Sequence, residues 1–238
     1  MRLPVPSPPS IRDFYAFEGH VMTCRRRRGL DMVPEWYQVP AFYFSNPAGV
    51  IGPDEPVWAP VGSRALDYEL ELACVIGKTG RDIPADDRAL EYVAGFTIMN
   101  DWSARDLQRV EMAVGLGPSK GKDFATSLGP WLVTFDELQD RYRDGRLHLE
   151  MSASVNGREL SRGDAGQMFW TWPALIAHAS RDARLRPGDV LGSGTVGTGC
   201  ILELTPEAAG GWLEPGDLVE LTVERLGTLR NRVVPRPS

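Results

Sequence analysis

The sequence contains few of the residues that would indicate a secreted or membrane protein. It has three cysteines among 238 residues, Cys24, Cys74 and Cys200, which are far apart and lack a Cys-x-x-Cys spacing. This argues against a disulfide framework or a zinc knuckle and indicates buried, inert thiols. No run of about 18 apolar residues is present, and the proline-rich N-terminus does not resemble a signal peptide. We therefore expect a cytoplasmic protein with no membrane partner.

Basic charge is also scarce. Lysine and arginine total 26 against 32 aspartates and glutamates, which gives a formal net charge of −6. Because phosphate binding needs a basic surface, we expect no nucleic-acid partner. The exception is the run from Arg25 to Arg28, which is typical of a solvated, mobile stretch but could also bind an anion such as a carboxylate substrate.

Short strand patterns separated by glycine and proline turns dominate the chain. Periodicity predicts strands over 66–76, 92–99, 129–134, 147–155, 189–191, 200–204 and 217–223. Helical signals are fewer: Ser103 followed by Asp106 resembles a capping box, and Pro173 suits the first turn of another helix. The pattern predicts one α+β, mainly β domain rather than a doubly wound parallel sheet.

Acidic side chains alternate with apolar ones along residues 66–72. The apolar residues share one strand face, which we expect to be core, and Asp67, Glu69 and Glu71 share the other. Exposure to solvent is the simplest alternative for an isolated Glu-x-Glu. Asp101 ends the later strand pattern YVAGFTIMN at the start of the proposed helix, where the helix dipole alone could favour it.

Convergence of Glu69, Glu71 and Asp101 would require a cation. Two like charges about 4 Å apart repel by about 4 kcal/mol at an effective dielectric constant near 20. Carboxylate oxygens are ligands for hard ions such as Mg²⁺, Ca²⁺ or Mn²⁺, whereas zinc would be expected to recruit histidine or cysteine.

Four segments occur in an order that resembles a known family: DYELELACVIGKTGRDI, YVAGFTIMNDWSARDLQ, GKDFATSLGPWLVT and GSGTVGTGCILEL. Over residues 66–204 they resemble the core signature of the fumarylacetoacetate hydrolase superfamily. The resemblance implies a mixed β-sandwich roll with a few short helices. It also implies an N-terminal segment, 1–62, with lid and active-site loop elements, a catalytic domain, 63–238, and a homodimer.

The resemblance implies one divalent metal, most simply Mg²⁺ with Mn²⁺ or Ca²⁺ as alternatives, bound by Glu69, Glu71 and Asp101. The upstream segment DFYAFEGHVMTCRRRRG resembles the animal-type fumarylacetoacetase. On that match, Asp13 is a fourth metal ligand and His20 is the catalytic base.

Further roles follow from the same resemblance. Lys122 and Gln108 match residues that bind substrate and stabilise developing negative charge, and Glu203 matches the glutamate that orients the histidine. Three residues match substrate contacts, namely Arg26, Tyr43 and Thr195, although the register near the arginine run is open.

The implied activity is hydrolysis of a carbon–carbon bond in a small diketo-acid, of the fumarylacetoacetate, fumarylpyruvate or acylpyruvate type, through an enolate stabilised by the metal. Aromatic catabolism is the usual setting of the family. Met112 stands where the animal-type enzyme has a tyrosine, which argues against fumarylacetoacetate itself. The alternatives are a 2-hydroxyhepta-2,4-diene-1,7-dioate isomerase or decarboxylase, an oxaloacetate-type decarboxylase, and a non-catalytic metal-binding scaffold.

Two other signals favour structural roles. Residues 192–197, GSGTVG, fit the dinucleotide pattern G-x-G-x-x-G, but the following CILEL reads as a strand, whereas that pattern must open a helix. His148 lies in an alternating segment and His178 in an apolar one. His20 is therefore the remaining candidate for an imidazole base.

Overall fold

The chain folds around a mixed seven-stranded sheet. The structure is a computed structural model that describes residues 3–237. Two of the strand pairs, β1–β13 and β3–β8, are parallel, and the other four are antiparallel. The spatial order is β2 (Phe42–Ser45), β1 (Ile11–Phe14), β13 (Val190–Gly192), β5 (Leu70–Ile76), β6 (Val93–Asp101), β8 (Thr126–Val133) and β3 (Val50–Ile51).

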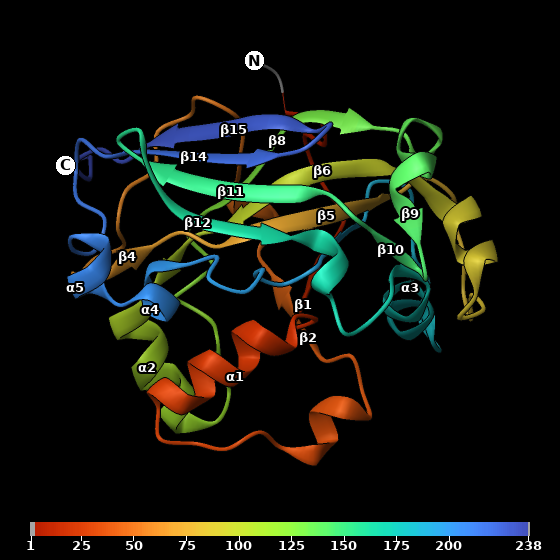
Figure 1. Ribbon diagram of the computed structural model, residues 1–238, viewed down its shortest axis with the longest axis horizontal. Helices are drawn as coiled ribbons and strands as arrows, with labels where there is room; N and C mark the ends of the chain where they lie inside the picture. Colours follow the sequence, from red (N-terminus) through yellow and green to blue (C-terminus); the bar gives the residue numbers. More distant parts are fainter. Residues whose placement is uncertain (1–2, 238) are drawn as a thin grey trace.

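A smaller antiparallel sheet packs against the first and forms the second layer (Figure 1). Its order is β12 (Arg158–Asp164), β11 (Glu150–Val155), β14 (Leu218–Val223) and β15 (Gly227–Arg232). Two short pairs complete the strands: β4 (Leu66–Asp67) with β7 (Ser103–Ala104), and β9 (Tyr142–Arg143) with β10 (Arg146–Leu147). The predicted α+β, mainly β architecture with a sandwich of sheets is confirmed.

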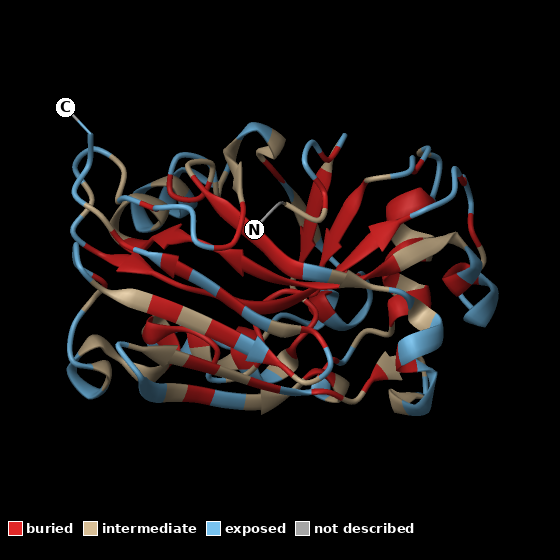
Figure 2. Cartoon of the chain, turned by 90° about the horizontal axis from the view of Figure 1, so that it is seen from above, coloured by how far each residue is buried: buried red, intermediate tan, exposed pale blue. Residues whose placement is uncertain are grey.

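The two sheets differ in burial because the larger one is covered on both faces. Every residue of β5 is buried, whereas residues of β14 alternate between buried and more exposed positions. Leu70, Leu72 and Cys74 belong to the main core between the sheets, and Ala73 and Val75 to a second core on the opposite face. Figure 2 shows this contrast along the strands. The acidic residues of this segment are therefore not exposed to solvent.

The helices are short and lie at the margins of the sheets. The α-helices are α1 (Glu18–Arg27), α2 (Arg105–Val114), α3 (Trp172–Ser180), α4 (Ile201–Leu204) and α5 (Pro206–Ala209). The 3₁₀ turns are η1 (Pro34–Tyr37), η2 (Pro47–Gly49), η3 (Asp87–Tyr92), η4 (Phe135–Arg141) and η5 (Ala165–Gln167). Within residues 3–237, no helix combines the length and apolar character needed to cross a membrane.

The helix expected near Pro173 is confirmed as α3, whose first turn is capped by the side chain of Thr171. The short helix predicted after Ser103 is confirmed as α2, but the capping box predicted at Ser103 is wrong. Helix α2 begins after Ala104 without a side-chain cap, and Ser103 lies in β7, where its hydroxyl donates to the carbonyl of Asp101 at 3.1 Å. The carboxylate of Asp106 instead accepts from Ser63 and from the backbone N–H of Arg64, both far away in sequence.

The strand predicted over 200–204 is also wrong, because residues 201–204 form the helical turn α4. The buried carboxylate of Asp67 accepts from the N–H groups of Ile201 and Leu202, at 2.8 and 3.0 Å, and so stabilises the start of that turn. The expected absence of a helix after residues 192–197 therefore no longer argues against a dinucleotide site. The rejection stands on other grounds, since these N–H groups are already bound to Asp67 and cannot receive a pyrophosphate.

The arginine run is helical rather than irregular. Arg25, Arg26 and Arg27 form the last turn of α1, where positive charge interacts favourably with the helix dipole. Arg26, Arg27 and Arg28 are exposed, as expected for a solvated run. The guanidinium of Arg27 donates to the carbonyl of Glu203 at 2.9 Å, so the end of α1 is joined to α4.

Candidate active site

Four carboxylates converge where strands β1, β5 and β6 approach one another. Asp13 lies in β1, Glu71 in β5 and Asp101 at the end of β6, and Glu69 directly precedes β5. Each offers an oxygen within 4.8 Å of the others, and all four side chains are buried. The structure thus brings together the four residues that the sequence predicted as metal ligands. Asp13 and Asp101 are both distant in sequence from Glu69 and Glu71.

A glycine makes this convergence sterically feasible. Strand β13 separates β1 from β5, and neighbouring strands lie about 4.8 Å apart. Gly192 of β13 is the register partner of Asp13, and a Cβ at this position would overlap both Asp13 Oδ1 and Met99 Cε. The missing side chain leaves the space that the Asp13 carboxylate occupies. Sequence reasoning included this glycine in a dinucleotide pattern and in the family segment GSGTVGTGCILEL, but assigned it no steric role.

Two buried cations face the acidic residues. The ammonium group of Lys122 contacts Glu69 and Asp101. Arg105 pairs with Asp67 and with Glu69, each at 2.8 Å. Two positive charges thus face five carboxylates, which leaves an excess of buried negative charge. Sequence reasoning did not single out Arg105, although it lies in the SARD phrase that follows Asp101.

The ionisation of the cluster reflects this excess. Burial, followed by the charge of Asp101, raises the pKa of Asp13 well above its usual range, and burial together with Asp13 does the same to Glu71. Burial also raises the pKa of Asp101, against the influence of Lys122. Burial would raise the pKa of Glu69 as well, but the adjacent cations outweigh it and lower that pKa to about 2.

The carboxylate cluster fits a hard divalent ion. Asp13 Oδ1 and Asp101 Oδ1 are buried and have no hydrogen-bond partner within the described part of the chain. An unpaired buried charge is costly, and a cation at the centre of the cluster would satisfy both oxygens. A ligand set made only of oxygens suits Mg²⁺ or Mn²⁺ better than zinc. The role of these residues as ligands remains a prediction that this geometry supports.

Two predicted substrate contacts are hydrogen-bonded to the cluster. The hydroxyl of Tyr43, which is paired in register with Asp13, donates to Asp101 Oδ2. Thr195 Oγ1 donates to Glu71 Oε1 at 3.3 Å. Both side chains therefore border the proposed metal position.

The other two predicted residues lie further from the carboxylates. Gln108, on α2, accepts from Arg105 at 3.1 Å and is partly buried. Arg26 is exposed on α1, and its side chain makes no hydrogen bond or ion pair among residues 3–237. The structure does not bring Arg26 into the network, and its role in substrate binding remains a prediction.

The imidazole of His20 is held by Glu203. Its Nδ1 lies 2.8 Å from Glu203 Oε2, and the other carboxylate oxygen accepts from the N–H of Thr198 at 3.1 Å. Burial would lower the pKa of His20, but interactions with Cys200 and Glu203 outweigh it and raise that pKa to about 10. The sequence predicted this histidine–glutamate pair through the resemblance alone, since the residues lie 183 positions apart.

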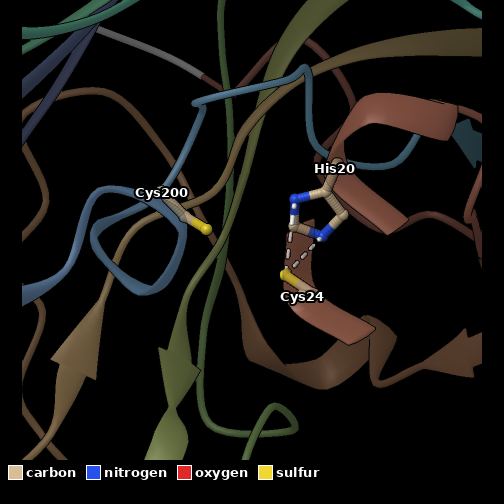
Figure 3. Close-up of side chains that lie close together, drawn as sticks. All are labelled: His20, Cys24 and Cys200. Carbon is tan, nitrogen blue, oxygen red and sulfur yellow. Dashed lines mark hydrogen bonds between the residues drawn. The ribbon is translucent and has the colours of Figure 1, made fainter. Parts of the chain in front are cut away.

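The predicted burial of the three thiols is confirmed. Cys74 lies in β5, but Cys24 and Cys200 lie beside His20, which sequence reasoning did not anticipate (Figure 3). The remaining histidines lie elsewhere: His178 packs against Phe42, and His148 lies 3.9 Å from a carboxylate oxygen of Asp164.

Comparison with known proteins agrees with this geometry. The sequence model of the family described as "Fumarylacetoacetate (FAA) hydrolase C-terminal" matches residues 10–234. A fumarylacetoacetase from Arabidopsis thaliana is 30% identical over 294 aligned positions, which cover 94% of this chain and 69% of that protein.

Solved structures extend the similarity to the whole fold. A 5-carboxymethyl-2-hydroxymuconate delta-isomerase from Mycobacterium smegmatis is 32% identical with a TM-score of 0.75, over 100% of this chain and 83% of that one. A fumarylpyruvate hydrolase from Pseudomonas aeruginosa, in complex with Mn²⁺ and pyruvate, is 26% identical with a TM-score of 0.76, over 97% of each chain. The chain therefore belongs to the fumarylacetoacetate hydrolase family of enzymes.

Proposed function

We propose that this protein is a divalent-metal-dependent hydrolase that cleaves a carbon–carbon bond in a small diketo-acid of the acylpyruvate type. The observation that carries the proposal is the presence of a histidine–glutamate pair near the carboxylate cluster. Arg105 and Asp67 connect the two, because Arg105 pairs with Glu69, and Asp67 binds the start of the turn that carries Glu203. His20 is also close enough for its charge to lower the pKa of Glu69.

Asp13, Glu69, Glu71 and Asp101 would hold Mg²⁺ or Mn²⁺, which acts as a Lewis acid on a carbonyl when bound. The 2.8 Å contact with Glu203 fixes the imidazole ring of His20, whose other nitrogen would take a proton from the attacking water. This step requires a neutral ring, and the raised pKa of His20 would fall next to a bound cation.

Lys122 would stabilise the negative charge that develops on the substrate. Its buried ammonium group contacts Glu69 and Asp101, at the border of the proposed metal position. A fixed cation in a buried site stabilises developing charge more strongly than water does. Gln108 would assist, oriented by its hydrogen bond to Arg105. Tyr43 and Thr195 would contact the substrate oxygens.

The decisive experiment is a spectrophotometric assay. A panel of acylpyruvates would be incubated with the full-length protein in the presence of Mg²⁺, of Mn²⁺, or of a chelator. We expect the enol absorbance to disappear and pyruvate to be released only when an ion is present. Failure to cleave any acylpyruvate with either ion would contradict the proposal.

Isomerisation or decarboxylation is the second candidate. The similarity to the Mycobacterium smegmatis isomerase, at 32% identity, supports it. The substrates would be 2-hydroxyhepta-2,4-diene-1,7-dioate or an oxaloacetate-type acid. A dienedioate that changes its absorbance without releasing a cleavage product would favour this activity over hydrolysis.

We also propose that two copies of the chain associate. Several large apolar side chains are exposed on the single chain, including Phe44, Val114, Leu116 and Trp131, and covering any of them with a second copy would remove apolar area from water. The mass of the protein in solution, measured by light scattering, would show whether it is a dimer.

A further inference from the structure

A second group of metal-ligating side chains lies outside the carboxylate cluster. His20 and Cys24 lie one turn apart on α1, and Cys200 directly precedes α4. One nitrogen and the two sulfurs all lie within 4.8 Å of one another, and all three residues are buried. Figure 3 shows the imidazole and the two thiols pointing toward one another. The proposed hydrolysis uses the imidazole but neither thiol.

The separations between these atoms are close to those in tetrahedral zinc sites, but the directions of the lone pairs are not yet those of a shared ion. With Zn–N of about 2.1 Å and Zn–S of about 2.3 Å, tetrahedral angles put nitrogen and sulfur ligands about 3.6 Å apart and two sulfurs about 3.8 Å apart. Cys24 Sγ lies 3.7 Å from Nε2 and 3.8 Å from Nδ1 of His20, so it faces neither nitrogen lone pair directly. Binding of an ion therefore requires the Cys24 thiol to rotate toward the Nε2 side of the ring, because Nδ1 already contacts Glu203. A disulfide between Cys24 and Cys200 would bring the two sulfurs to about 2.05 Å. A shared zinc ion would leave them about 3.8 Å apart.

The chemistry of the three side chains selects a soft ion. Two thiolates and an imidazole favour Zn²⁺ or Cd²⁺, whereas Mg²⁺ prefers oxygen. Glu203 supports two of the three side chains. Its carboxylate contacts His20 Nδ1 at 2.8 Å and Cys200 Sγ at 3.6 Å. A carboxylate bound to a ligating histidine is the usual support for such an ion. Ion binding would release the thiol protons, so that two thiolates balance the charge of the ion.

We propose that His20, Cys24 and Cys200 form a second metal site, selective for a thiophilic ion such as Zn²⁺, whose occupation inhibits the enzyme by taking up the imidazole. The site then acts as a metal-sensitive switch next to the carboxylate cluster. The inhibition rests on the proposed hydrolytic role of His20, whereas ion binding does not. The two parts are therefore tested separately.

The binding test uses Cd²⁺ as the probe. The full-length reduced protein, with excess Mg²⁺ to occupy the carboxylates, is titrated with Cd²⁺ while the ultraviolet thiolate-to-cadmium charge-transfer band is recorded. We expect the band to saturate at one ion per chain. Cys24→Ser and Cys200→Ser should each weaken binding at least about a hundredfold, since loss of a hydrogen-bond partner of a ligand alone costs about 10–100-fold.

Cys74→Ala is the matched control, because Cys74 is a buried thiol in β5 outside the group. It should keep the full band. Thermal unfolding of each variant checks that it is folded, and Cys24→Ala provides a second variant if the serine is not tolerated. Absence of the band in the wild-type protein, or an equal band in the Cys24 variants, would overturn the site.

The inhibition test measures acylpyruvate cleavage with Mg²⁺ present. Zn²⁺ should inhibit the wild-type and Cys74→Ala proteins at about one ion per chain, and removal of Zn²⁺ by a chelator followed by fresh Mg²⁺ should restore activity. Cys24→Ser should need at least about a hundredfold more Zn²⁺. A full Cd²⁺ band with no effect of Zn²⁺ on turnover would overturn the switch. Inactivity toward every acylpyruvate without Zn²⁺ would instead overturn the proposed function and leave the binding result intact.

Discussion

The carboxylate cluster and the histidine–thiol group lie close together but are built differently. The carboxylate cluster takes its residues from three strands of the large sheet and from the residue before β5, so that strand register fixes their separation. The histidine–thiol group takes two residues from successive turns of α1 and one from the segment before α4. One set of ligands is all oxygen and the other is nitrogen and sulfur, so ligand chemistry alone can direct different ions to each.

The two groups also differ in how their charge is balanced when no ion is bound. In the carboxylate cluster, buried anions outnumber cations, and oxygens of Asp13 and Asp101 are unpaired within residues 3–237. In the histidine–thiol group, burial raises the pKa of Cys200 well above its usual range, so this thiol keeps its proton and stays neutral. Without an ion, the first group keeps protons on some of its carboxylates, as the raised pKa of Asp13 and of Glu71 indicates. The second can remain empty until a thiophilic ion displaces its protons.

The largest effect that separates the groups should come from Glu71→Ala. We expect Mg²⁺ binding to be lost and turnover to fall at least about a thousandfold, because Lewis-acid stabilisation contributes several kcal/mol and about 1.4 kcal/mol corresponds to tenfold in rate. The protein should stay folded and retain its Cd²⁺ band. Calorimetric titration with Mg²⁺, together with the acylpyruvate assay, measures both quantities.

The control for this variant is Glu207→Ala, which removes an exposed carboxylate on α5. It should change neither Mg²⁺ binding nor turnover. Unchanged turnover in Glu71→Ala would mean that the carboxylate cluster is not the catalytic metal site.

A smaller effect is expected from His20→Ala, which should leave Mg²⁺ binding intact and slow hydrolysis at least about a hundredfold through loss of the general base. The Cd²⁺ band should weaken, because one of the three ligands is gone. His178→Ala is the matched control, since that ring packs against Phe42 outside both groups. Retained acylpyruvate cleavage in His20→Ala would show that His20 is not the general base.

The smallest effect should be a pH dependence of stability in the metal-free protein. Burial, followed by neighbouring charges, raises the pKa of Asp13 and Glu71 in the folded state. The folded protein then binds more protons than the unfolded chain. The stabilisation is present below the unfolded pKa of about 4 and is lost as pH rises toward the folded pKa.

Urea unfolding between about pH 5 and 8 measures this effect. With a chelator present, the midpoint should fall as pH rises. With Mg²⁺ the trend should reverse, because the ion binds deprotonated ligands. Glu69 should not contribute in this range, since its stabilisation is lost only as pH falls through about 2. Glu71→Gln should flatten the metal-free profile, and an unchanged slope in that variant would show that the dependence arises elsewhere.

Local sequence patterns predicted some elements and failed at others for identifiable reasons. Helix α3 follows from Thr171 and Pro173, which act within its own first turn. Helix α4 and the start of α2 do not follow from their own residues. The start of α4 contacts Asp67, which is far away in the chain. The first turn of α2 contacts Ser63 and Arg64, which are also far away in sequence. A pattern within one segment carries no information about such partners.

The predicted chemistry of the site comes from residue types, their local spacing and the family resemblance. The alternation around Glu69 and Glu71, the acidic end of β6 and the ordered family segments predict an oxygen-ligated metal and a histidine base. Solvent exposure, the simplest alternative for the acidic strand face, is excluded, because a second core on that face of the sheet buries it.

The tertiary structure alone decided how the charges are balanced and which thiols meet. Arg105 and Lys122 reach the carboxylates across the fold, Gly192 leaves space for Asp13, and Cys200 comes to lie beside Cys24 from 176 residues away. The reason is physical. Residue type and local spacing follow from the sequence, but which buried side chains share a few ångströms of space depends on strand order and packing between distant segments.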